Sequence, residues 1–207
     1  MVFMPGKPRS GSPGTRTCLA PGPRARIKYS TAAQAAREPA MAPLCPVAAG
    51  LLLGPARAAC DPALLGHHRV TLCINVSRQQ PFPGLPHLRC IRVPVFDDPA
   101  EDLYRHFDRC GEAIEAAVRG GGTCLVYCKN GRSRSAAVCT AYLMRHRKLT
   151  LKEAFAVPYP CPNLHLDISG TVKAARPEAE PNAGFWAQLQ RYEEELQMQR
   201  QSAEQRT

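Results

Sequence analysis

One short loop, residues 128–135, restricts the fold of this chain more than any other segment. Its sequence, Cys-Lys-Asn-Gly-Arg-Ser-Arg-Ser, follows an apolar run at 123–127 and precedes a run with helical spacing at 135–146. The apolar run predicts a buried strand, so the loop should lie where a strand passes into a helix. Backbone N–H groups at a helix N-terminus converge and favour an anion. The segment therefore predicts an anion-binding loop at the carboxyl end of a central strand.

The residue types in this loop suit the capture of a phosphoryl group. Arg134 and the helix N-terminus both favour negative charge, so Cys128 should be held partly as a thiolate, which can attack phosphorus. The Arg134 guanidinium can hold two phosphoryl oxygens in a bidentate fork, which a lysine cannot do. Gly131 lets the chain curl so that several amides converge. Ser135 can donate a hydrogen bond to the sulfur and make it a better leaving group.

A lone cysteine after an apolar strand is usually only a small buried hydrophobe. Here the spacing to the glycine, arginine and serine favours a nucleophile instead. The side chains of Lys129 and Arg132 are expected to be solvated charges that set the local field and the substrate preference. The predicted phosphate-binding residues are Lys129, Asn130, Gly131, Arg132, Ser133 and Arg134.

The loop resembles the signature of the atypical, cysteine-dependent dual-specificity protein phosphatases, which is His-Cys, five residues, Arg, and then Ser or Thr. Segments 72–76, 93–98 and 141–144, and Arg176-Pro177 with Pro181-Asn182, are similar to further landmarks of that family. The resemblance implies hydrolysis of phosphotyrosine, phosphoserine and phosphothreonine in proteins through a phosphocysteine intermediate. It implies Cys128 as nucleophile, Arg134 as phosphate ligand, Ser135 as the group that assists release, and no metal or organic cofactor.

In that family an aspartate on a loop well upstream of the nucleophile protonates the leaving oxygen. Asp97 occupies the matching position, and Asp98 stands beside it. Either carboxyl could be the acid, and Asp97-Asp98-Pro99 would also suit the cap of a helix. We interpret Asp97 as the general acid and Asp98 as the cap.

One departure from the signature concerns the residue before the nucleophile, where the family has His and this chain has Tyr127. A phenol is neutral at pH 7 but can still donate a hydrogen bond, so the loop should form while the thiolate fraction falls. We therefore expect a weak enzyme. The alternative is a catalytically impaired relative that binds phosphoproteins. Sulfur-transfer and arsenate-reducing enzymes share the Cys-to-Arg spacing but give no role to Asp97.

Strands and helices alternate along the chain. Strands are predicted at 51–53, 70–76, 88–95 and 123–127, and helices at 56–65, 99–119, 135–146 and from Asn182 to about residue 196. Such alternation predicts an α/β fold with a central, mostly parallel sheet flanked by helices on both faces. The resemblance implies the protein tyrosine phosphatase-like version of this architecture.

The 207 residues predict one domain at 44–198 with flanking segments. Residues 1–43 are basic and rich in Pro and Gly, which predicts a disordered extension, and Met41 could be an alternative start. Residues 199–207 read as a polar tail. Residues 156–171 are an atypical insertion relative to the family, which prolines make incompatible with a continuous helix. The insertion is either a surface loop or the product of a splicing or gene-model difference.

Composition narrows the range of partners. The net charge of +10 invites a nucleic-acid function, but much of the excess lies in the first forty residues, without interleaved aromatic residues. Ten cysteines without a secretory signal favour a cytoplasmic or nuclear location, and prolines in the extension oppose mitochondrial import. Cys161 with His165 gives too few ligands for a zinc site. We expect a monomer that acts on phosphoprotein substrates and binds neither nucleic acid nor a membrane.

Overall fold

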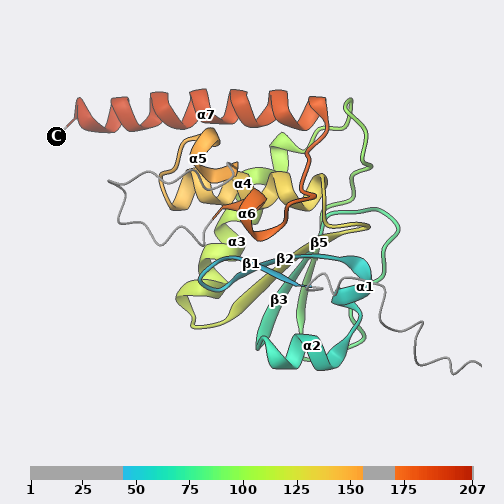
Figure 1. Cartoon of the computed structure of the whole chain (residues 1–207). Coiled ribbons are helices and arrows are strands. Elements are labelled where there is room, and N and C mark those ends of the chain that lie inside the picture. Colours follow the sequence, from blue (N-terminus) through green and yellow to red (C-terminus); the bar gives the residue numbers. More distant parts are fainter. Residues whose placement is uncertain (1–43, 156–170, 207) are drawn as a thin grey trace, which may run out of the picture. The chain divides into compact units, whose positions relative to one another are not determined.

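The computed structural model describes residues 44–155 and 171–206. The predicted extension at 1–43 and the predicted insertion, apart from Thr171, lie outside this range. A five-stranded sheet has the order β1-β2-β5-β3-β4, in which only the β1–β2 pair is antiparallel (Figure 1). The strands are β1 (Cys45–Ala48), β2 (Leu51–Pro55), β3 (Val70–Asn75), β4 (Arg89–Arg92) and β5 (Thr123–Cys128). The sheet is therefore mostly parallel, as predicted, and β5 is its central strand.

Alternation along β5 divides the core into two clusters. Cys124, Val126 and Cys128 belong to the larger cluster, whereas Leu125 and Tyr127 belong to the smaller one on the opposite face. Successive side chains of a strand point to opposite faces of the sheet. The nucleophile and the tyrosine before it therefore face different layers of the molecule.

Helices cover both faces of the sheet, which confirms the predicted arrangement. The short helices α1 (Ala56–Ala59) and α2 (Pro62–His67) pack on the smaller cluster. The other face carries α3 (Phe107–Arg119), α4 (Arg134–His146), α5 (Leu151–Phe155), α6 (Val172–Ala175) and α7 (Ala183–Glu204) (Figure 1). No helix within the described residues is long and apolar enough to cross a bilayer.

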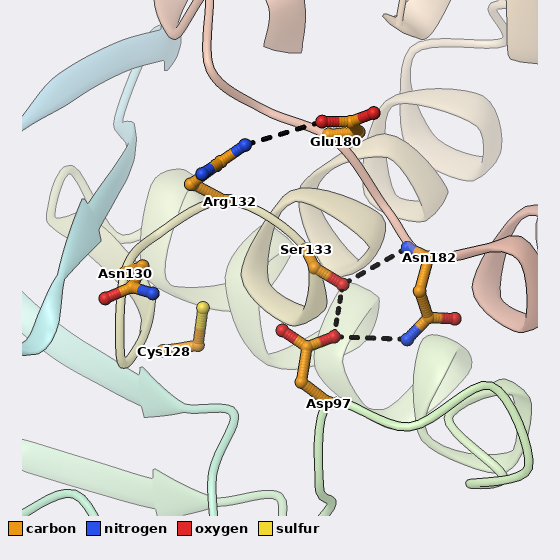
Figure 2. Close-up of a pocket in the computed structure, with 7 residues that line it drawn as sticks. All are labelled: Asp97, Cys128, Asn130, Arg132, Ser133, Glu180 and Asn182. Atoms are coloured by element: carbon orange, nitrogen blue, oxygen red, sulfur yellow. Dashed lines mark hydrogen bonds and ion pairs between the residues drawn. The ribbon is translucent and has the colours of Figure 1, made fainter.

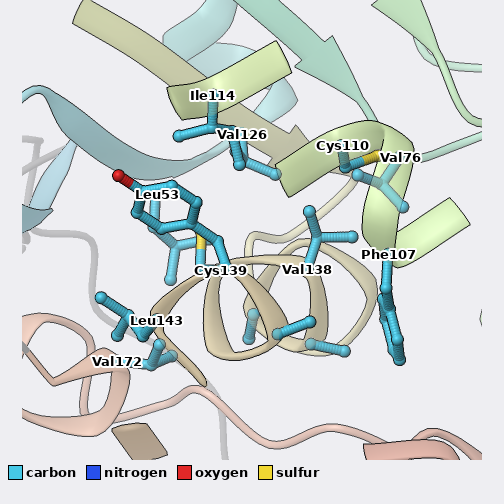
Figure 3. Packing of buried hydrophobic residues seen from close by; sticks show 14 of the residues in the cluster. Leu53, Val76, Phe107, Cys110, Ile114, Val126, Val138, Cys139, Leu143 and Val172 are labelled. Atoms are coloured by element: carbon cyan, nitrogen blue, oxygen red, sulfur yellow. The ribbon is translucent and has the colours of Figure 1, made fainter. Parts of the chain in front are cut away.

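Helix α4 follows the predicted anion-binding loop at residues 128–135, called the phosphate loop below. The helix is buried along almost its whole length. All its residues from Arg134 to Met144 are buried, and it contacts β5, α3 and α7. Val138 and Cys139 on α4 lie among Phe107, Val126 and Leu53 from the surrounding elements (Figure 3). Close packing of this kind leaves α4 little freedom to shift relative to the sheet. The loop therefore has a buried strand on one side and a buried helix on the other.

The predicted helix at 99–119 is wrong in its first part. The α-helix begins at Phe107, after a single 3-10 turn at Tyr104–His106 (η2). Residues before that form a turn in which the Ala100 N–H donates to Asp98 Oδ1 at 2.8 Å. The N–H groups of Leu103 and Tyr104 both donate to Gln188 Oε1 of α7, at 2.9 and 2.8 Å. This tertiary partner replaces the helical turn that the spacing predicted.

Two further elements differ from the prediction. The helix at 56–65 is divided, because Asp61 accepts hydrogen bonds from Ala63 N and Leu64 N and so begins a new helix at Pro62. Strand β1 was not predicted because it is only four residues long and contains a proline, which an edge strand tolerates.

The C-terminal helix follows the prediction at its start. Asn182 caps it by accepting a hydrogen bond from Phe185 N at 3.0 Å. Its buried residues, Phe185, Leu189, Tyr192 and Leu196, recur at steps of three or four and form its apolar face. The helix continues to Glu204, so the polar residues after 198 extend it.

Candidate active site

The phosphate loop closes tightly against strand β2. Cys128 ends β5 and Arg134 begins α4, so residues 129–133 form the connection. Gly131 has φ of +65°, and a Cβ there would lie 2.6 Å from the carbonyl carbon and oxygen of Gly54. Both the left-handed backbone and the close approach exclude a side chain, so Gly131 is required for the loop to take this course.

The sulfur of Cys128 has a hydrogen-bond donor beneath it. The Ser135 hydroxyl donates to Cys128 Sγ at 3.1 Å, and both residues are buried. Ser135 lies in the first turn of α4, which returns the chain to the end of β5. The structure thus brings together the two residues for which the sequence predicted a joint role.

Asp97 is held at the mouth of the loop by groups from two other segments. Its Oδ1 atom accepts from Ser133 Oγ at 2.5 Å and from Asn182 Nδ2 at 3.1 Å, and the Asn182 N–H donates to Ser133 Oγ at 3.3 Å (Figure 2). The Asp97 side chain is 41% exposed, so solvent and a bound substrate can reach it. Asp98 instead accepts from the Ala100 N–H in the adjacent turn. The two neighbouring carboxylates therefore face different surroundings.

The Arg134 side chain lies almost buried beside Asp97. Its Nη1 atom donates to Val95 O at 3.4 Å, and its Nε atom is 3.7 Å from Asp97 Oδ2. The Nε–H has no hydrogen-bond partner among the described residues. A buried donor without a partner costs about 1–3 kcal/mol. An oxyanion bound in the loop would lower that cost by accepting from the guanidinium.

A pocket of about 260 Å³ opens above the sulfur (Figure 2). Its lining residues are Asp97, Cys128, Asn130, Arg132, Ser133, Glu180 and Asn182. Among the predicted phosphate-binding residues, the Lys129 side chain is exposed and lines a neighbouring pocket instead. Arg132 is also exposed, but its Nε–H donates to Glu178 O at 3.0 Å. No group of three metal-ligating side chains occurs in the described part of the chain.

Tyr127 does not contact the sulfur. Its hydroxyl donates to Pro81 O at 2.8 Å, and its ring lies in the smaller core cluster, on the opposite face of the sheet from Cys128. The Asn75 side-chain amide donates to the same carbonyl at 3.2 Å. Burial raises the pKa of the Tyr127 phenol well above its ordinary value, so the hydroxyl stays a neutral donor at physiological pH. In the structure, the Tyr127 side chain links the backbone at Pro81 to the central strand β5 through this hydrogen bond.

Three residues near the pocket were not predicted as site residues. Asn182 was assigned only to the start of a helix, yet it also binds Asp97 and Ser133. Glu180 lines the pocket, and the buried Arg176 donates from Nη2 to Asn130 O at 2.9 Å. The only sequence signal for this segment was its similarity to a family landmark, because local periodicity says nothing about contacts between such distant positions.

Comparison with known proteins identifies the family to which this chain is similar. The dual specificity phosphatase catalytic domain family matches residues 51–195. Human dual specificity phosphatase 28 is 59% identical over 79% of this chain and 85% of its own length. A mouse dual specificity phosphatase solved in complex with zinc tungstate is 57% identical, with a TM-score of 0.68 over 78% of this chain and 93% of that one.

A more distant structure, the human tyrosine phosphatase-like serine/threonine/tyrosine-interacting protein, is 28% identical, with a TM-score of 0.61 over 72% of this chain and 95% of its own. The extent of the family match and the identity to its members agree with the fold and with the strand-loop-helix arrangement around Cys128. The chain belongs to the dual specificity phosphatase family of protein phosphatases.

Proposed function

We propose that this protein phosphatase hydrolyses phosphotyrosine, phosphoserine and phosphothreonine in proteins through a phosphocysteine intermediate. The observation that carries the proposal is the hydrogen bond from Ser135 to Cys128 at the floor of the pocket, with Asp97 at the mouth. A donor to the sulfur stabilises a thiolate and later assists its departure from phosphorus. The mouse relative's complex with zinc tungstate supports an oxyanion site, because tungstate is a tetrahedral oxyanion like phosphate.

The reaction would proceed in two displacements at phosphorus. The Cys128 thiolate forms an S–P bond while the P–O bond to the substrate side chain breaks, and Asp97 gives its proton to the departing oxygen. Arg134 and the loop amides hold the other phosphoryl oxygens as charge spreads over them. Asp97, now ionised, then takes a proton from water as that water attacks phosphorus and the S–P bond breaks. Ser135 stabilises the sulfur as negative charge returns to it.

Trapping the intermediate tests this proposal directly. Full-length protein mixed with an aryl phosphate and quenched rapidly in acid should carry one phosphoryl group on the peptide that contains Cys128, detected by mass spectrometry. A panel of phosphotyrosine, phosphoserine and phosphothreonine peptides should all release inorganic phosphate. If phosphate release proceeds with no phosphorylated Cys128 under any quench condition, the two-step route is wrong.

The role of Asp97 gives a prediction that separates it from Asp98. Asp97→Asn should lower kcat for a phosphotyrosine peptide about a hundredfold, because general acid catalysis typically contributes factors of 10²–10⁴. The loss should be much smaller for an aryl phosphate whose leaving group is already acidic and needs no proton. Asp98→Asn is the matched control and should leave both rates near those of the parent. An equal loss for both substrates in Asp97→Asn would contradict the assignment.

Tyr127 is proposed to make the enzyme weak, and its replacement by histidine tests this. Tyr127→His should raise the turnover of an aryl phosphate about fivefold to tenfold, because the imidazole that the family has at this position helps to order the loop around the sulfur. Steady-state kinetics and the alkylation rate of Cys128 between pH 5 and 8 would measure both effects. Tyr127→Phe is the control, since it removes the hydrogen bond to Pro81 without supplying an imidazole and should not raise turnover. Unchanged or lower turnover in folded Tyr127→His would refute the proposal.

A phosphoprotein-binding role without turnover is the second candidate. It is favoured by Tyr127, which departs from the family signature, and by the likeness to a protein whose name describes it as phosphatase-like and interacting. A parent protein that binds phosphopeptides but never releases phosphate, at any enzyme concentration, would establish this alternative.

A further inference from the structure

The mouth of the catalytic pocket carries more negative than positive side chains. Among the described residues that line it, Arg132 is the one cation, whereas Asp97 and Glu180 are both carboxylates. The Arg132 guanidinium is already engaged, because its Nη2 atom lies 3.4 Å from Glu180 Oε2 (Figure 2). In addition, its Nε–H donates to Glu178 O. A phosphate dianion that enters the pocket must therefore approach a carboxylate that competes with it for Arg132.

The position of Glu180 is set by backbone contacts with the phosphate loop. The Glu180 N–H donates to Arg132 O at 2.8 Å, and the Asn182 N–H donates to Ser133 Oγ. Directly before Glu180, the carbonyl of the buried Ala179 accepts a hydrogen bond from the Lys173 ammonium at 2.9 Å. These contacts hold residues 178–182 along the loop and present the Glu180 side chain at its edge.

The ion pair between Arg132 and Glu180 is too exposed to contribute much to the stability of the fold. The two side chains are 52% and 73% exposed, and exposed pairs contribute only about 0–1 kcal/mol. A carboxylate at this exposure can exchange one cationic partner for another. A lysine or arginine on a bound peptide is such a partner.

Side chains on the other side of the loop carry a net positive charge. A second pocket of about 510 Å³ shares Asn130 and Arg132 with the first, and its other charged lining residues are Arg57, Lys129, Arg176 and Glu178. A positively charged group of a substrate is therefore favoured only on the side of the loop where Glu180 lies. A peptide that extends over both pockets would experience a field that changes sign along its length.

We propose that Glu180 makes this enzyme select phosphopeptides with a lysine or arginine close to the phosphorylated residue, on one side of it only. The basic side chain pairs with Glu180, and this releases Arg132 toward the phosphoryl group. Substrates without such a residue must compete with the Glu180 carboxylate for Arg132. The inference rests on the proposed hydrolysis of phosphopeptides and adds a substrate class to it.

A lysine scan tests the proposal on the full-length protein. Each phosphotyrosine peptide would carry a single lysine in an otherwise uniform alanine sequence. The lysine would occupy one of the two positions before the phosphotyrosine or one of the two positions after it. Lysine on one side should raise kcat/KM about threefold to fivefold over the alanine peptide, as expected for an exposed ion pair. The preference should disappear in Glu180→Gln and shrink in 1 M salt, where the Debye length falls to about 3 Å.

Glu178→Gln is the matched control, because it removes a carboxylate from the same segment that lines the other pocket. Glu178→Gln should keep the lysine preference. The proposal is overturned if Glu180→Gln keeps it too, or if lysine helps equally on both sides, which would indicate general charge steering.

Binding measurements keep this test independent of catalysis. Fluorescence anisotropy with Cys128→Ser and with the double variant Cys128→Ser/Glu180→Gln would report peptide affinity without turnover. Lysine-dependent affinity that is present in the first protein and absent in the second would support the role of Glu180 even in a protein that releases no phosphate. Absence of phosphate release by the parent protein would reject the proposed hydrolysis and leave this inference standing, whereas an equal effect of lysine on the affinities of both variants would reject the inference alone.

Discussion

Cys128→Ser should reduce phosphate release by about four orders of magnitude or more. Removal of the nucleophile of a covalent mechanism has effects of this size, because the remaining groups can bind substrate but cannot form the intermediate. A serine hydroxyl stays protonated at neutral pH, and neither Ser135 nor the loop can change that sufficiently. Initial rates with an aryl phosphate and with phosphotyrosine, phosphoserine and phosphothreonine peptides would measure the loss.

The same variant should keep its affinity for phosphopeptides, since the loop amides and Arg134 remain in place. Cys60→Ser is the appropriate control, because Cys60 is an exposed cysteine at the end of α1 and should be replaceable without loss of activity. Residual turnover in Cys128→Ser within tenfold of the parent would show that another group carries the reaction.

Arg134→Lys should have the second largest effect, a decrease in kcat of about a thousandfold. Lysine keeps the positive charge but loses the planar fork that can donate two parallel hydrogen bonds to phosphoryl oxygens. Removal of one well-placed donor to developing charge typically costs factors of 10²–10³, and this change also removes the donor to Val95 O. The loss should fall mainly on kcat, because the fork matters most when charge spreads over the equatorial oxygens.

Arg134 is nearly buried, so loss of activity must be separated from loss of fold. Thermal unfolding of Arg134→Lys, followed by circular dichroism, should show a transition close to that of the parent and of the exposed control Arg109→Lys. A folded Arg134→Lys protein with more than a third of the parent's kcat would exclude the bidentate role.

The sequence predicted the strand-loop-helix unit well because its structure depends on neighbouring residues. The apolar run before Cys128 gave β5, the helical spacing after it gave α4, and the spacing of the loop predicted that Ser135 returns to the sulfur. The alternation of strands and helices likewise predicted a mostly parallel sheet covered on both faces. Each of these features follows from steric and hydrophobic preferences that act over a few residues.

The predictions that were wrong involve contacts between distant segments. The helix predicted from residue 99 begins only at Phe107, because Gln188 of α7 accepts hydrogen bonds from the N–H groups of Leu103 and Tyr104 and a turn forms there instead. The sequence could not show this, because the partner lies more than eighty positions away.

The sequence by itself determined that a thiol, a glycine, a guanidinium and a hydroxyl stand at spacings at which they can converge on one anion. Only the tertiary structure decided which carboxylate lies at the mouth of the loop, where the Tyr127 hydroxyl binds, and that Glu180 and Asn182 stand at that mouth. The physical reason is that side-chain orientation at the pocket depends on packing of the 178–182 segment and the Asp97 loop against α4. Those contacts form only when the whole chain has folded.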